Sequence, residues 1–140
     1  MARGNLIEAI IFRKENNDYE FLLLKRTVER GGFWQPITGG IEENETKLNA
    51  VKREVEEEIG VKNPLNIIEN VHSFILEGDK KEEFVFGVEI DLNEKITLEK
   101  NVSLEHEEYK WCKFEEALNL LKWKGNKEGL TKLNFILKNN

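Results

Sequence analysis

Residues 39–61 decide the fold, and they read GGIEENETKLNAVKREVEEEIGV. The second half of this stretch is typical of an amphipathic helix, because its apolar residues recur three or four positions apart. These residues are Leu48, Val51, Val55 and Ile59. Thr46 is placed to cap the start of the helix, and Gly60 is placed to end it in a left-handed conformation. The sequence therefore predicts a loop followed by a helix over residues 47–59.

Three glutamates of this helix fall on one arc beside its apolar face. At about 100° per residue, Glu54, Glu57 and Glu58 project together, close enough for their charges to repel. A divalent cation would remove that repulsion, and ligation by carboxylate oxygens alone favours Mg²⁺ or Mn²⁺. The alternative interpretation is an acidic helix face that is simply solvated.

Nine positions of the stretch follow the pattern G-x5-E-x7-R-E-U-x-E-E-x-G-U, in which U is aliphatic. The matching residues are Gly39, Glu45, Arg53, Glu54, Val55, Glu57, Glu58, Gly60 and Val61. This pattern resembles the Nudix box, and a match at so many fixed positions on a predicted loop and helix is rarely a coincidence. The resemblance implies the α/β fold of that family, an α/β/α sandwich with a mixed central sheet, and a metal-dependent hydrolase.

The resemblance also implies a role for each of these residues. The implied metal ligands are Glu54, Glu57, Glu58 and a backbone carbonyl of Gly39 or Thr38. Arg53 and Glu45 would form a supporting pair, in which the guanidinium holds Glu45 or a ligand in position. Glu54 or a later glutamate would also serve as the base.

Sequence outside the box resembles the branch of dATP and dihydroneopterin triphosphate pyrophosphohydrolases. The similar segments are residues 33–39 (FWQPITG), residues 105–111 (EHEEYKW) and the part around Trp123. By this resemblance Glu105 is the distal glutamate that completes the metal site or activates water. Glu107 and Glu108 are the alternatives, and His106 is expected to be a structural hydrogen-bonding residue.

Three further residues are candidates for substrate contact. Lys25 and Arg26 end a predicted strand where they could reach phosphate, although cations at strand ends are usually only solvated. Trp34 could stack on a base or a pterin, or it could anchor a loop or the core. The aromatic residues Phe74, Phe84 and Phe86 are expected in the core of the sheet.

The remaining elements mix strands with helices without a regular alternation, which predicts an α/β or α+β sandwich. Predicted strands cover residues 6–12 and 19–24 as a hairpin, a short piece near 34–37, and 71–76, 83–91 and 109–114. The strand over 83–91 is expected to bury one face. Predicted helices follow over 115–121 and 127–137.

Composition sets the class of the protein. A chain of 140 residues with 39% hydrophobic and 34% charged residues fits a single soluble domain over residues 1–140. The net charge of −6 disfavours nucleic-acid or membrane partners, and the lone Cys112 excludes a multi-cysteine zinc site. We expect a cytoplasmic monomer or homodimer whose partner is a small-molecule substrate.

The predicted function is therefore Mg²⁺-dependent, or Mn²⁺-dependent, pyrophosphohydrolysis. The substrate would be a nucleoside or pterin triphosphate, cut to the monophosphate and pyrophosphate. One alternative is a dinucleoside polyphosphate hydrolase, because the sequence GGIE at residues 39–42 also occurs in that branch. A second alternative is a Nudix module that binds nucleotides without cutting them.

Overall fold

The computed structural model describes residues 4–98 and 106–139. Its chain begins with the predicted hairpin, whose strands are longer than the sequence indicated: β1 covers Leu6–Glu15 and β2 covers Asp18–Arg26. The turn between them consists of Asn16 and Asn17, which both have positive φ angles of 53° and 67°. Asparagine tolerates this left-handed conformation, and such turns match the twist of paired strands.

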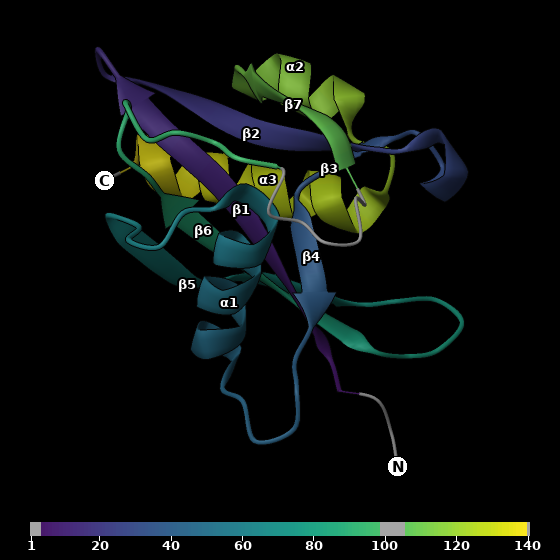
Figure 1. Ribbon diagram of the computed structural model, residues 1–140. Coiled ribbons are helices and arrows are strands. Elements are labelled where there is room, and N and C mark those ends of the chain that lie inside the picture. The colour runs from purple at the N-terminus through teal and green to yellow at the C-terminus, as the bar shows by residue number, and fades with distance from the viewer. Residues whose placement is uncertain (1–3, 99–105, 140) are drawn as a thin grey trace.

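β1 is the centre of a mixed sheet of seven strands in the described residues (Figure 1). It pairs in parallel with β6 on one side, and antiparallel with β4 and β2 along the other. The further strands are β3 (Trp34–Gln35), β4 (Ile37–Gly40), β5 (Asn66–Ile75), β6 (Glu82–Glu89) and β7 (His106–Cys112). A short 3-10 turn, η1 (Val28–Arg30), lies between β2 and β3.

Helices cover both faces of the sheet, which confirms the α/β/α sandwich with a mixed central sheet. Helix α1 (Lys47–Ile59) packs on one face, and α2 (Phe114–Leu120) and α3 (Lys124–Lys138) pack on the other (Figure 1). The alternation along β1 separates two cores, because Ile7, Ala9 and Ile11 face α1 whereas Ile10 and Phe12 face α3.

Helix α1 has the bounds that its sequence predicts. The Thr46 hydroxyl accepts a hydrogen bond from the Asn49 backbone N–H at 3.1 Å, which caps the first turn. Gly60 ends the helix at φ 76° and ψ 16°, a conformation that costs glycine little. These two local signals fix which residues of the helix face the sheet.

The prediction that residues 83–91 bury only one face was wrong. Phe86 and Val88 of β6 pack on the α1 side, and Val85 on the α3 side is also only 1% exposed. Because β6 lies inside the sheet with a helix on each face, both sets of side chains are covered. Separately, no helix in residues 4–98 or 106–139 is long and apolar enough to span a membrane.

Candidate functional site

The three predicted ligand glutamates lie on α1 but differ in burial. Glu54 and Glu58 are 8% and 7% exposed, whereas the side chain of Glu57 is 56% exposed. Two of the carboxylates therefore sit at the edge of the core and the third faces solvent. Of the three, Glu54 lines a cavity of about 980 Å³, which also borders Lys47 and Lys81.

Glu54 is in close contact with strand β4, which contains the first glycine of the box pattern. A Cβ atom built at Gly39 would come within 2.7 Å of Glu54 Cγ and closer still to its carboxyl group. Only glycine allows the backbone of β4 to approach this carboxylate so closely. The first position of the box pattern is therefore glycine because any side chain there would overlap Glu54.

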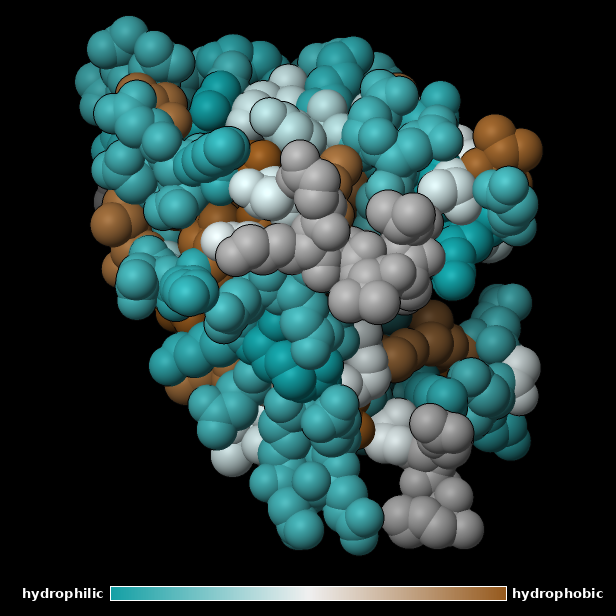
Figure 2. Space-filling model, viewed as in Figure 1, coloured by the Kyte–Doolittle hydropathy of each residue, from teal (hydrophilic) through white to brown (hydrophobic). Residues whose placement is uncertain are grey.

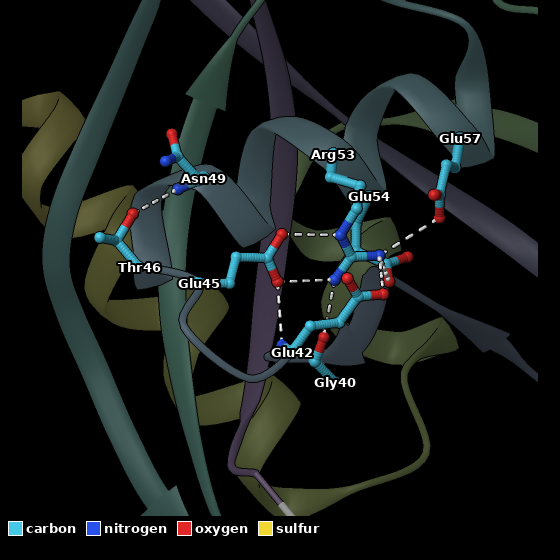
Figure 3. Close-up of polar contacts among 8 residues, drawn as sticks. All are labelled: Gly40, Glu42, Glu45, Thr46, Asn49, Arg53, Glu54 and Glu57. Carbon is cyan, nitrogen blue, oxygen red and sulfur yellow. Dashed lines mark hydrogen bonds and ion pairs between the residues drawn. The ribbon is translucent and has the colours of Figure 1, made fainter.

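Arg53 joins the loop to the helix (Figure 3). Its guanidinium donates to both carboxylate oxygens of Glu45, at 2.8 Å from Nε and 3.0 Å from Nη2. The same Nη2 donates to the Gly40 carbonyl at 2.8 Å. The Arg53 contact lowers the pKa of Glu45 below its usual value, and Glu45 in turn raises the pKa of Arg53. This two-point contact has the planar fit that arginine makes with carboxylate.

The other end of the guanidinium lies among more carboxylates. Arg53 Nη1 is 3.0 Å from a Glu54 oxygen, 3.4 Å from a Glu57 oxygen and 3.7 Å from a Glu42 oxygen. With Glu45, four carboxylates therefore surround one cation, which leaves an excess of negative charge. An oxygen-only donor set with surplus negative charge fits a hard divalent cation.

The pKa of Glu54 is raised to about 7. Burial is the largest cause, the charges of Glu57 and Glu58 add to it, and the nearby Arg53 opposes it. In the described residues, no three acidic, histidine or cysteine side chains already converge tightly enough to hold a metal ion. The side chains consequently fit a cation in charge and chemistry, and they would have to close around it.

A buried hydrogen-bond chain holds Glu58 from behind. Gln35 Nε2 lies 2.9 Å from His106 Nε2, and His106 Nδ1 lies 3.1 Å from Glu58 Oε1. Because the Gln35 amide group donates, His106 Nε2 accepts, so the ring proton is on Nδ1 and is donated to Glu58. His106 thus has the hydrogen-bonding role that the sequence suggested, and it orients a box glutamate.

The structure gives the predicted substrate contacts other partners. Lys25 pairs with Glu107 at 3.7 Å, while Arg26 donates to the Arg30 carbonyl at 3.1 Å and lies 5.7 Å from the centre of the Phe33 ring. Trp34 is half-buried and packs against the core on the α3 side. Their contact with substrate therefore stays a prediction.

The choice of distal glutamate also stays a prediction. Glu105 lies outside the described residues, and Glu107 and Glu108 are exposed on β7. Glu107 faces Lys25 from the neighbouring strand β2, and Glu108 pairs in register with Lys25.

Sequence reasoning missed a second polar group, on the opposite face of the sheet. Glu8 in β1 and Glu83 in β6 are 0% and 5% exposed, and Asn126 of α3 donates to Glu8 at 2.9 Å. The available signal was a charged residue at an inward position of the apolar run LIEAIIF, which is unusual in a core strand. The pairing of Glu8 with Glu83 had no local signal, since 75 positions separate the two residues.

Comparisons with known proteins agree with this geometry. The family model described as the NUDIX domain matches residues 5–133. The asymmetrical bis(5'-nucleosyl)-tetraphosphatase of Mus musculus is 32% identical over 132 residues, which cover 86% of this chain and 86% of that protein. An octanoyltransferase of Myxococcus xanthus is 36% identical over 112 residues, which cover 76% of this chain but only 30% of that protein.

Solved structures show the same fold. A NUDIX hydrolase from Listeria monocytogenes superposes with a TM-score of 0.86 at 28% identity, covering 99% of this chain and 97% of that chain. The dihydroneopterin triphosphate pyrophosphohydrolase of E. coli superposes with a TM-score of 0.75, covering 96% and 95% of the two chains. At 23% identity, the second match shows the fold alone.

Proposed function

Because this chain belongs to the Nudix family, we propose that it is a Mg²⁺-dependent pyrophosphohydrolase that cuts a nucleoside or pterin triphosphate to the monophosphate and pyrophosphate. The observation that carries this proposal is the buried Glu54 carboxyl, pressed against Gly39 and repelled by two neighbouring glutamates. Mn²⁺ would serve as an alternative ion.

Glu54, Glu57 and Glu58 would hold the ion, together with a backbone carbonyl of Gly39 or Thr38. A bound Mg²⁺ supplies positive charge for the phosphate oxygens and makes a coordinated water more acidic. Arg53 keeps the box loop against α1 through Glu45 and Gly40, and Gly39 of this loop lies against Glu54. His106 keeps the Glu58 carboxylate pointing in one direction.

A glutamate would accept the proton of the attacking water, and Glu105 and Glu54 are the candidates. Lys47 and Lys81 border the cavity beside the carboxylates, where their charges would attract the rest of the polyphosphate. We keep Lys25, Arg26 and Trp34 as proposed substrate contacts. The substrate is a small molecule rather than a nucleic acid, because the chain carries a net charge of −6, and we propose that the protein acts in the cytoplasm.

The test is Mg²⁺-dependent release of pyrophosphate by Glu58→Gln, with Glu56→Gln as the matched control. Both changes remove one carboxylate from α1, but Glu56 is exposed and occupies a variable position of the box pattern. We expect Glu58→Gln to lose at least about 100-fold in kcat and Glu56→Gln to keep wild-type turnover. Equal turnover in the two variants would refute the role given to Glu58.

A second candidate function is hydrolysis of a dinucleoside polyphosphate. It is favoured by the 32% identity to the mouse tetraphosphatase over most of both chains. Separation of the products from diadenosine tetraphosphate and from nucleoside triphosphates decides between the two activities. A Nudix module that binds without cutting is disfavoured, because all the box glutamates are present.

A further inference from the structure

Opposite charges gather on the two helical faces of the sheet. Residues 42–58, which form α1 and the loop before it, hold seven glutamates and three basic residues, and Figure 2 shows hydrophilic side chains over this part of the surface. Residues 122–138, which include α3 on the other face, hold five lysines and one glutamate. A chain with a net charge of −6 thus carries a segment of charge +4, on the far side of the sheet from the candidate metal site.

Part of this basic segment lines a cavity of about 560 Å³, a volume that suits a small molecule. Lys124, Lys127 and Lys132 of α3 line it, together with Leu118 and Asn119 from the end of α2. The cavity shares no lining residue with the cavity beside the box glutamates. It is therefore a separate space, with lysines in place of carboxylates.

The charges of these lysines are not neutralised by neighbouring carboxylates. In the part of the chain that the structure describes, none of the three lysines forms an ion pair. Glu128 is the one acidic residue among the described residues of the lining, and its Oε1 atom lies 3.4 Å from His72 Nε2 instead. Unpaired cations around one space repel one another, so an anion between them would be attracted.

His72 of β5 supplies a polar atom that lacks a hydrogen bond. Its imidazole lines the cavity, is 12% exposed and stacks on Phe74 with the ring centres 5.9 Å apart. Its Nε2 atom is buried and has no hydrogen-bond partner within residues 4–98 and 106–139, although Glu128 lies nearby. A neutral imidazole can carry its proton on Nε2 and donate it to a phosphate oxygen. The wall of the cavity thus offers a donor in addition to positive charge.

We propose that this cavity binds the phosphate or pyrophosphate group of a small molecule without a metal ion. Lys127 and Lys132 pair with the phosphate oxygens, and His72 donates a hydrogen bond to them. The candidate metal site has the opposite chemistry, because its carboxylates need a cation before phosphate can approach. The inference therefore names a second site and does not depend on the proposed hydrolysis.

The test is calorimetric titration with pyrophosphate in EDTA at low ionic strength, because salt screens exposed charges. The first variant combines Lys127→Ala with Lys132→Ala, and it should fold because both lysines are exposed. Lys138→Ala, at an exposed position of α3 outside the cavity, is the matched control. We expect the double variant to bind pyrophosphate at least about fivefold more weakly, and the control to stay within about twofold of wild type.

A second variant changes the charge of the cavity in the other direction. Glu128→Gln removes the negative charge from the lining, so it should bind pyrophosphate at least about twofold more tightly than wild type. AMP is the second probe, titrated into the same proteins. The ratio of its affinity to that of pyrophosphate tells a phosphate carried on a nucleoside from a bare anion.

Absence of pyrophosphate binding by the wild-type protein would overturn the inference. Equal affinity in wild type and the double variant would also overturn it, because the anion would then bind elsewhere, such as beside Lys47 and Lys81. Weaker binding in Glu128→Gln would contradict the charge argument. Since the titration requires no hydrolysis, its result stands whether or not the proposed function holds.

Discussion

One methyl group added at Gly39 should disable the site, whereas the same group at Gly40 should not. In Gly39→Ala the new Cβ would lie 2.7 Å from Glu54 Cγ. Ordinary contacts begin at 3.4 Å, so the side chain of Glu54 must retreat by at least 0.7 Å (3.4 minus 2.7). The strand cannot yield instead, because Gly39 is paired in register with Ile7 of the central strand β1.

The expected size of the effect follows from this displacement. Mg²⁺ demands near-ideal geometry at about 2.0–2.1 Å from each oxygen, so a ligand moved by this amount is lost or strained. A misplacement of about 1 Å at a reacting centre costs about 100-fold in rate. Forcing the extra carbon into a packed contact should also lower the free energy of unfolding by about 1–3 kcal/mol.

Gly40→Ala is the matched control. A Cβ atom at Gly40 meets nothing within 4 Å, and Gly40 is not among the glycines with positive φ. We expect its stability to stay within about 0.5 kcal/mol of wild type. The assays are Mn²⁺ binding by calorimetry, Mg²⁺-dependent pyrophosphate release and urea unfolding. If Gly39→Ala binds Mn²⁺ and turns over as well as Gly40→Ala, Gly39 does not position Glu54 as we describe.

Two further changes test the supporting residues. Arg53→Ala should lower kcat by about 10–100-fold and the free energy of unfolding by about 1–3 kcal/mol, because Glu45 and Glu54 lose their cationic partner. Lys52→Ala, at a neighbouring exposed position, should change neither quantity. Equal effects of the two changes would contradict the supporting role of Arg53. Burial raises the pKa of Glu8 in the folded state, so the stability that this carboxyl group contributes is fully present below its unfolded pKa of about 4.3 and is lost as the pH rises through the raised folded value. Glu8→Gln removes this loss, so its urea midpoint should fall less than that of wild type between about pH 5 and about pH 8; parallel profiles would contradict a buried, protonated Glu8.

Local sequence signals predicted the box helix well. The cap at Thr46, the stop at Gly60 and the apolar spacing lie within one short segment, so they do not depend on the rest of the chain. The same holds for the hairpin of β1 and β2, whose turn residues adjoin the strands. The fold class followed from the resemblance carried by this segment, and the comparisons and the structure agree with it.

Long-range features could not be predicted in this way. The second buried face of β6 depends on α3, which lies far along the chain, so alternation alone suggested a solvent-exposed face. The contact of Glu58 with His106 and the pairing of Glu8 with Glu83 likewise depend on which strands become neighbours. Glu54 is buried and Glu57 is not because β4 packs against α1 beside Glu54. The spacing of residues along the helix could not predict where β4 would lie.

The central claim is that α1 holds a divalent cation through its box glutamates. Calorimetric titration with Mn²⁺ tests it most directly, on wild type, Glu54→Gln, Glu58→Gln and the exposed control Glu56→Gln. The account predicts that the first two variants bind Mn²⁺ at least about tenfold more weakly, while the control binds as wild type does. Equal Mn²⁺ affinity in all four proteins would contradict it.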